Sequence, residues 1–293
     1  MSTSMDPRAA HLRDRLRGAL LAAAATPMTA AGEVDPDVVS RYLAGLVADG
    51  ADGLAVLAHT GRGPYLGEEL RAEIVKRAVA LGVPVIVGVG GAGGLAELVG
   101  QAEAARDLGA DGVMLFPSPG DRVAAHEAVW RATGMPMIAF DLYTAPCPPA
   151  VLRDLLAHPG VAGLKVALLS DAMACQDAIA AARAAGRLAI TGEDRMFGPS
   201  LLWGAQAALV GIAAARVQVT AEVVRAFRGS DLRAFEAASA RLDRLAAATF
   251  TEPMEGYVQR MLWLAAGEGR IPASHAHDPY GPRLGESGVA FED

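Results

Sequence analysis

The hydrophobic residues of the chain recur as short runs that are separated by longer amphipathic segments. Apolar, strand-like runs begin near residues 20, 53, 84, 112, 136, 161, 187 and 208. Between most of them, Ala-rich segments repeat apolar residues at helical spacing, as in 39–46, 70–79, 95–108 and 172–185. Alternating strands and helices favour a parallel sheet. Eight such units in 293 residues predict an α/β fold, the (β/α)8 TIM barrel.

The pattern changes after residue 218. Helical spacing continues over 221–227, 232–245 and 255–264 with no strand-like run between the segments. This predicts a C-terminal helical appendage, and the end of the chain, rich in Pro, Gly, His and Asp, is typical of an irregular tail. We therefore divide the chain into a barrel over 18–220 and C-terminal helices and tail over 221–293.

The first 17 residues are polar and carry four arginines, which predicts a disordered N-terminal tail over 1–17. The apolar run 19–25 that follows them has the order of a signal peptide, basic residues first. The run is short, Ala-rich and ended by Thr26-Pro27, so a first strand is the favoured interpretation and a signal peptide is the alternative.

Composition and charge exclude several classes of function. The net charge of −7 provides no basic surface for nucleic acid. The apolar runs are too short to cross a membrane. Two cysteines, Cys147 and Cys175, do not indicate a disulfide framework. We expect a cytoplasmic protein whose partner is a small molecule rather than nucleic acid or membrane.

One charged residue stands inside the apolar run 161–167. It is Lys165, and the chain has only one other lysine, Lys76, in a charged helical pattern. Because side chains alternate along a strand, Lys165 shares its face with Gly163 and Ala167, which leaves room for a ligand. A desolvated lysine can lose its proton and attack a carbonyl, whereas arginine cannot. The alternative is a lysine with a buried stem whose ammonium reaches water.

The ends of the predicted strands carry polar residues. In a TIM barrel the active site lies at the carboxyl ends of the strands. Polar groups that converge there on one desolvated lysine suit a Schiff-base site. The residues at these ends are Thr26, His59, Thr60, Arg62, Asp141, Tyr143, Glu193 and Asp194.

Five short motifs occur together in a fixed order: Ala25-Thr26-Pro27, Thr60-Gly61, Gly88-Val89-Gly90, Gly163-Leu164-Lys165 and Gly192-Glu193-Asp194. With these motifs the chain resembles, from about residue 18 to 285, the dihydrodipicolinate synthase and N-acetylneuraminate lyase family of class I aldolases and lyases. The resemblance implies a barrel with C-terminal helices and a homo-oligomer, usually a tetramer, with a dimer as the alternative. It implies no metal or organic cofactor. It also implies a 2-oxo acid, often pyruvate, bound as an imine on Lys165.

The chain departs from the family pattern at the proton relay. His59 stands where the family has a threonine, and Phe140 stands where it has a tyrosine that shuttles protons to the imine. The tyrosine pair after strand 4 is replaced around Ser118 and Pro119. Phenylalanine cannot carry a proton. His59 is therefore our candidate for the principal proton shuttle, because an imidazole titrates near neutral pH, and a structural histidine is the alternative.

The remaining candidates are expected to assist proton transfer or to contact the substrate. Tyr143, three residues beyond Phe140, is a candidate for returning a phenol from the loop and is at most an auxiliary proton shuttle. Phe140 is expected to fill the space of the tyrosine that it replaces. Thr60 and the backbone of Gly61 are expected to bind the carboxylate of the oxo acid, as the resemblance implies, and an ordinary turn residue is the alternative for Thr60.

Two charged candidates have open roles. Arg62 replaces a family glutamate and pairs either with a substrate carboxylate or, on the surface, with Glu68 or Glu69. Glu193 either lines the site or caps a loop.

Two other motifs favour structural interpretations. Residues 88–93 fit G-x-G-x-x-G, but the next strand ends in Phe116-Pro117 rather than in the acidic residue that a dinucleotide site uses. His275, His277 and Asp278 follow the last helix without a further ligand group, so we interpret them as a loop and predict no metal site.

These features predict a lyase that forms a Schiff base with pyruvate or another 2-oxo acid and acts by aldol cleavage, aldol addition with an aldehyde, or dehydration. Ala145 lies near the position of the arginine that binds a second carboxylate in the lysine-pathway enzymes, so we expect a different substrate. A sugar-acid dehydratase of the same family is one alternative. A non-catalytic oxo-acid-binding protein on the same barrel is another, because a fold does not fix a function.

Overall fold

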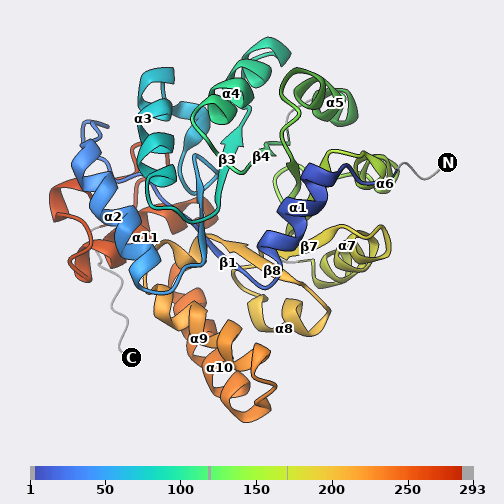
Figure 1. The fold of residues 1–293 in the computed structure, drawn as a ribbon. Helices are drawn as coiled ribbons and strands as arrows, with labels where there is room; N and C mark the ends of the chain where they lie inside the picture. The colour runs from blue at the N-terminus through green and yellow to red at the C-terminus, as the bar shows by residue number, and fades with distance from the viewer. Residues whose placement is uncertain (1–3, 118–119, 170, 286–293) are drawn as a thin grey trace.

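The structure, a computed structural model, describes residues 4–117, 120–169 and 171–285. Its strands form a closed parallel barrel in which each strand pairs with its neighbours in sequence and β8 pairs with β1 (Figure 1). The predicted (β/α)8 barrel is confirmed, and every predicted strand start lies within one residue of the observed one. The strands are β1 Leu20–Ala23, β2 Gly53–Val56, β3 Val85–Val89, β4 Gly112–Leu115, β5 Met137–Leu142, β6 Val161–Ala167, β7 Leu188–Thr191 and β8 Ala207–Val210.

A ring of helices covers the outside of the barrel (Figure 1). Strand residues are buried on both faces because one face meets the helices and the other fills the barrel interior. This is why the strands read as uninterrupted apolar runs. The helices that follow the strands are α2 Pro36–Ala48, α3 Glu68–Val79, α4 Leu95–Asp107, α5 Arg122–Thr133, α6 Pro149–Ala157, α7 Ala172–Ala184, α8 Phe197–Leu202 and α9 Val217–Arg228.

The buried side chains form two cores, one on each side of the sheet. On β6, Leu164 and Val166 belong to the outer core between sheet and helices. The inner core fills the barrel and includes Phe140 of β5 and Ile190 of β7. Strand register pairs Phe140 with Lys165 and Lys165 with Ile190. Lys165 therefore faces the interior of the barrel.

The prediction of a disordered tail over 1–17 is wrong for residues 7–16, which form helix α1, Pro7–Leu16. The Asp6 carboxylate caps its first turn by accepting a hydrogen bond from the Arg8 amide at 2.9 Å. Ala9, Leu12 and Leu16 recur at helical spacing and are buried in the inner core, where they close the amino-terminal end of the barrel. Because most residues of α1 are polar, the composition of the segment does not reveal its narrow apolar stripe.

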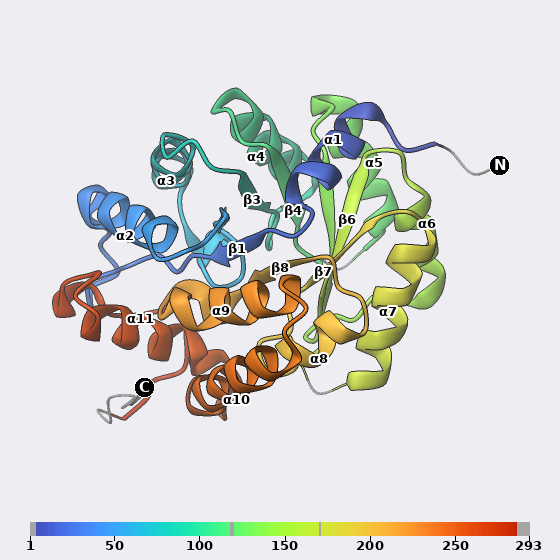
Figure 2. The ribbon, with the colours of Figure 1, turned by 60° about the horizontal axis from the view of Figure 1, so that its bottom comes forward.

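The C-terminal residues fold back beside the carboxyl ends of the strands. α10 Leu232–Thr249 packs on α9, and α11 Tyr257–Gly267 packs on the turn η2, Gly211–Ala214, that follows β8. Figure 2 shows α1 and α11 on opposite sides of the barrel. Two further turns of 3-10 helix, η3 Met254–Gly256 and η4 Ala273–His275, flank α11, and η1 Gly63–Tyr65 lies after β2.

The predicted boundary at residue 220 falls inside α9, and the division into barrel and appendage stays a prediction. Among the described residues, none of the helices combines the length and the apolarity that crossing a membrane requires.

Candidate active site

Lys165 lies at the centre of the candidate site. Its side chain is buried and its Nζ lies 4.4 Å from the centroid of the Phe140 ring. On the neighbouring strand end, a Cβ at Gly192 would lie only 2.6 Å from Lys165 Cε. The glycine therefore leaves the space through which the lysine stem passes. Phe140 thus lies beside the amine, and its place next to a substrate stays a prediction.

Burial decides the protonation of this amine. Desolvation lowers the pKa of Lys165 to about 8, and the charges of Asp194 and Glu193 oppose this shift. Burial also raises the pKa of Asp194, whose carboxylate accepts a hydrogen bond from the Ile212 amide at 2.7 Å. The neutral, nucleophilic form of Lys165 is thus far more accessible near neutral pH than for an exposed lysine.

Glu193 caps the loop after β6. Its Oε2 accepts a hydrogen bond from the Leu169 amide at 3.0 Å, and its Oε1 accepts one from Leu168. Asp141, near the end of β5, accepts a hydrogen bond from the Cys147 amide at 2.7 Å. Burial raises the pKa of Glu193 to about 6, and its charge also acts on Lys165.

His59 and Tyr143 meet at a third residue, Glu255 of η3. His59 Nε2 lies 3.2 Å from Glu255 Oε2, and the Tyr143 hydroxyl donates a hydrogen bond to Glu255 Oε1. The two rings lie 6.3 Å apart. Burial would raise the pKa of Glu255, but hydrogen bonding to His59 and its charge, with smaller effects from Tyr143 and Arg62, outweigh it and lower this pKa to about 2.

Arg62 does not form the surface ion pair that the sequence suggested as one of its two roles. Its side chain is buried, and Nη2 lies 2.7 Å from Asp278 Oδ2 while Nη1 lies 3.0 Å from Glu255 Oε2. Both partners come from the C-terminal region, not from Glu68 or Glu69. With two carboxylates already bound, this guanidinium has no unpaired charge to offer a substrate.

Thr60 and Gly61 lie beside a buried phenol. Thr60 Oγ1 is 3.0 Å from the hydroxyl of Tyr257, the first residue of α11. The Thr26 hydroxyl donates to the Gly61 carbonyl at 2.7 Å and so fixes this part of the loop. The charge of Asp194 acts on the pKa of both Lys165 and Tyr257.

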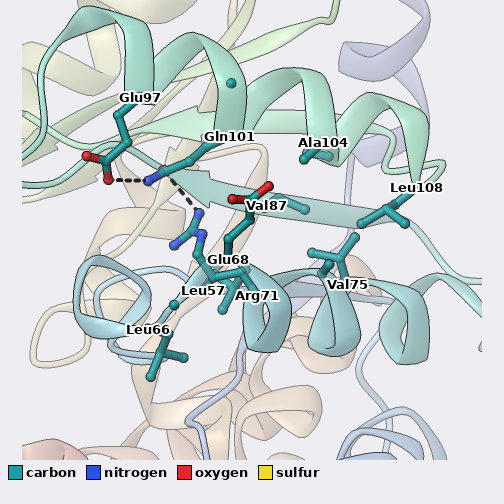
Figure 3. Close-up of a pocket in the computed structure, with 14 residues that line it drawn as sticks. Leu57, Leu66, Glu68, Arg71, Val75, Val87, Glu97, Gln101, Ala104 and Leu108 are labelled. Atoms are coloured by element: carbon teal, nitrogen blue, oxygen red, sulfur yellow. Dashed lines mark hydrogen bonds between the residues drawn. The ribbon is translucent and has the colours of Figure 1, made fainter.

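A cavity of about 360 Å³ lies outside the barrel, between α3 and α4 (Figure 3). Lys165 and His59 do not line it. Its Arg71 donates hydrogen bonds to the carbonyls of Gly63 and Gly88 at 2.7 and 2.8 Å and to the Gln101 side chain. These bonds tie the loop that carries His59 and Arg62 to the end of β3.

Three further predictions concern other groups. Ser118 and Pro119 lie outside the described residues. Asp278, which the sequence places beside His275 and His277, is bound to Arg62 instead. No group of three or more His, Cys, Asp or Glu that could hold a metal ion is found among the described residues.

No sequence motif indicated the contributions of Glu255, Tyr257 and Asp278. The segment 254–264 has the apolar spacing of a core helix, and most of α11 is indeed buried. Its first residues turn toward the barrel mouth, however, and no local motif marks that turn. Asp194 was named at a strand end and in a motif but was given no role, although it is the carboxylate with the larger effect on Lys165.

Comparisons with known proteins identify the family of the chain. The Dihydrodipicolinate synthetase family matches residues 16–287. A 4-hydroxy-tetrahydrodipicolinate synthase from Moorella thermoacetica is 32% identical over 274 residues, which cover 87% of this chain and 91% of the relative. One from Acidiphilium cryptum is 28% identical over 249 residues, which cover 79% and 82%.

Solved structures show the same fold. N-acetylneuraminate lyase from Mycoplasma synoviae has a TM-score of 0.79 at 19% identity and covers 94% of this chain and 95% of its own. A prophage protein of the dihydrodipicolinic acid synthase family from E. coli K12, in complex with pyruvate, has a TM-score of 0.81 at 21% identity, with coverage of 92% and 93%. The chain therefore belongs to the dihydrodipicolinate synthetase family and is a lyase of the class I aldolase type.

Proposed function

We propose that the chain binds pyruvate or another 2-oxo acid as an imine on Lys165 and then makes or breaks a bond next to the imine carbon. The observation that carries this proposal is the buried amine above the Phe140 ring, whose pKa burial lowers to about 8. The pyruvate complex of the E. coli K12 neighbour supports the choice of oxo acid.

The chemistry begins at the neutral amine. Lys165 Nζ attacks the C2 carbonyl of the oxo acid, and the resulting carbinolamine loses water to give the protonated imine. The imine draws electrons from C3, so loss of a C3 proton gives an enamine. The enamine adds to an aldehyde in the aldol direction, whereas cleavage of the C3–C4 bond releases an aldehyde in reverse. Elimination of a hydroxyl group as water is the dehydratase variant.

Thr60 and the amide of Gly61 are proposed to hold the carboxylate of the oxo acid. If the Tyr257 phenol donates to Thr60 Oγ1, the threonine keeps its own hydrogen for the substrate. A carboxylate bound at this loop orients the C2 carbonyl for attack, which is worth several kcal/mol when the reacting atoms are well aligned.

His59 is proposed to move the protons. Burial raises the pKa of Tyr143 and of Tyr257 well above 10, and the carboxylate of Glu255 adds to the shift of Tyr143. Both phenols therefore keep their protons near neutral pH and can donate hydrogen bonds but are poor bases. An imidazole both accepts and releases a proton in this range.

Borohydride trapping tests the proposal. Reduction in the presence of a panel of 2-oxo acids should fix one adduct, located by mass spectrometry on the tryptic fragment that holds Lys165. Lys165→Arg should abolish it, because a guanidinium stays protonated. An adduct on Lys76, or no adduct with any acid of the panel, would overturn the assignment.

Two alternatives remain distinguishable from aldol chemistry. A sugar-acid dehydratase of the same family would release water rather than an aldehyde, and a non-catalytic oxo-acid-binding protein would form the adduct without steady turnover. The cytoplasmic location and the homo-oligomer, tetramer or dimer, stay predictions.

A further inference from the structure

Three side chains of the barrel mouth meet at the carboxylate of Glu255. Oε2 lies 3.2 Å from His59 Nε2 and 3.0 Å from Arg62 Nη1, and Oε1 accepts the hydroxyl hydrogen of Tyr143. On the basis of the function proposed above, we propose that Glu255 is a positioning residue that fixes the imidazole of His59 for proton transfer. The segment between α10 and α11 thereby completes the active site.

The contact through Nε2 decides which nitrogen of His59 acts as the base. A carboxylate only accepts hydrogen bonds, so it favours the neutral imidazole that carries its hydrogen on Nε2. The lone pair is then on Nδ1, which is left to take a proton from the substrate. When Nδ1 does so, the new positive charge faces Glu255, as in other pairs of a histidine base and an orienting carboxylate.

The surroundings of His59 restrict the movement of its ring. The Tyr143 ring lies 6.3 Å from the imidazole on one side, and the Tyr257 ring lies 6.2 Å away. Arg62 contacts the same carboxylate that His59 does. The imidazole thus lies near two aromatic rings and is bound through one nitrogen to Glu255.

Arg62 holds Glu255 in place through both its side chain and its backbone. Its Nη1 binds the Glu255 carboxylate, and its Nη2 donates to the Glu255 carbonyl at 3.1 Å. Its other donors bind Asp278, with Nε 3.1 Å and Nη2 2.7 Å from Oδ2. The side chains of Arg62 and Asp278 are almost completely buried, so this charge-assisted pair is screened little by water. The C-terminal tail therefore secures Glu255 through Arg62.

Gly281 permits this arrangement. A Cβ at that position would lie 2.4 Å from Asp278 Oδ2 and 3.2 Å from Arg62 Nη2. A substitution there would displace the Asp278 carboxylate without touching His59 or Lys165. It offers a second way to loosen Glu255, from a residue outside the catalytic machinery.

A double-mutant cycle tests the inference. Glu255→Gln keeps the shape of the side chain but removes the charge, and we expect it to lower kcat at least about tenfold, a part of the 10²–10⁴ that acid–base help supplies. KM for the oxo acid should change little, and trapping at Lys165 should persist. In a His59→Ala background the same change should cost nothing further, because Glu255 acts through His59. Glu252→Gln is the matched control, since that carboxylate is exposed and accepts a hydrogen bond from the Met254 amide.

Nitrogen-15 NMR of the imidazole gives a second readout. At a pH where the ring is neutral, the wild-type chain should show His59 protonated on Nε2, and Glu255→Gln should show a mixture of tautomers. Gly281→Ala should lower kcat in the same direction by a smaller factor. Equal losses with and without His59, or an unchanged tautomer, would overturn the inference. Absence of any Lys165 adduct in the wild-type chain would instead overturn the proposed function.

Discussion

The Cα of Gly192 faces the stem of Lys165 so closely that a methyl group there would lie 2.6 Å from Lys165 Cε. Heavy atoms do not approach so closely without displacement, and the same methyl group would lie 2.9 Å from the Val166 carbonyl. The backbone at Gly192 therefore packs against the side chain of Lys165 and limits the positions that the amine can take.

Gly192→Ala should disable the amine. The new methyl group displaces the lysine stem, so we expect the rate of borohydride trapping to fall at least about tenfold, on the scale of a misplaced reacting group. Trapping rates at fixed oxo-acid concentration measure this. Gly100→Ala in α4 is the control, because no atom of the described residues, apart from the adjacent backbone of its own helix, lies within 4 Å of the new Cβ. Unchanged trapping in Gly192→Ala would show that Lys165 reacts from another position.

The barrel and the direction of Lys165 could be predicted from the sequence for a simple physical reason. Strands buried on both faces give unbroken apolar runs, so their positions are readable. Alternation along β6 then assigns Leu164 and Val166 to one face and Lys165 to the other, as observed.

The ion pairs of the barrel mouth could not be predicted in the same way. Arg62 binds Asp278 across 216 residues of sequence, and its spacing to Glu68 and Glu69 suggested a nearer partner. Which segment folds over the strand ends depends on the packing of α11 against η2, not on any local pattern. The α1 helix was missed because only its narrow face is apolar.

Removal of Asp194 should shift the pH dependence of imine formation. Burial lowers the pKa of Lys165 to about 8, and the Asp194 charge opposes that shift by stabilising the ammonium. Without the carboxylate the ammonium loses this support, so the pKa falls further. Trapping should rise with pH through about 8 in the wild-type chain, and Asp194→Asn should move this rise to lower pH.

Initial trapping rates between pH 5 and pH 10, at saturating oxo acid, measure this shift. Asp171→Asn is a suitable control. Asp171 is the N-terminal cap of α7, and its carboxylate accepts a hydrogen bond from the Ala174 amide. A limb that stays in place or moves to higher pH in Asp194→Asn would contradict the electrostatic role of Asp194.

Leu12→Ala should weaken the whole barrel. Leu12 is buried in the inner core and its Cδ2 would lie 2.7 Å from a Cβ at Gly112, so it closes the end of the barrel. Leucine-to-alanine changes in a core cost about 2–5 kcal/mol of unfolding free energy. The urea midpoint should fall accordingly, whereas Leu232→Ala, at an exposed leucine, should leave it nearly unchanged. A midpoint unaffected by Leu12→Ala would mean that α1 contributes little to folding.

Condensation of pyruvate with aspartate semialdehyde should be negligible. That reaction needs a cation for the second carboxylate, and Ala145 stands near the position where the resemblance places an arginine. Arg62 cannot substitute, because Asp278 and Glu255 already bind it. A coupled dihydrodipicolinate reductase assay, with an authentic synthase as the positive control, measures this, and robust product formation would refute the prediction.

Proton transfer should depend on His59 more than on Tyr143. Forming the imine and breaking the neighbouring bond both need a group that gives and takes protons, and such help is worth about 10²–10⁴ in rate. Phe140 cannot supply it, and the raised pKa of Tyr143 keeps that phenol protonated. His59→Ala should therefore lower kcat at least about 10²-fold on the same scale, and the pH profile of turnover should lose one limb. Trapping at Lys165 should continue, more slowly.

Tyr143→Phe removes one hydrogen bond to Glu255 but leaves the imidazole in place, so it should lower kcat clearly less than His59→Ala does. The reverse order of effects, with Tyr143→Phe severe and His59→Ala nearly silent, would assign the proton transfer to the phenol instead.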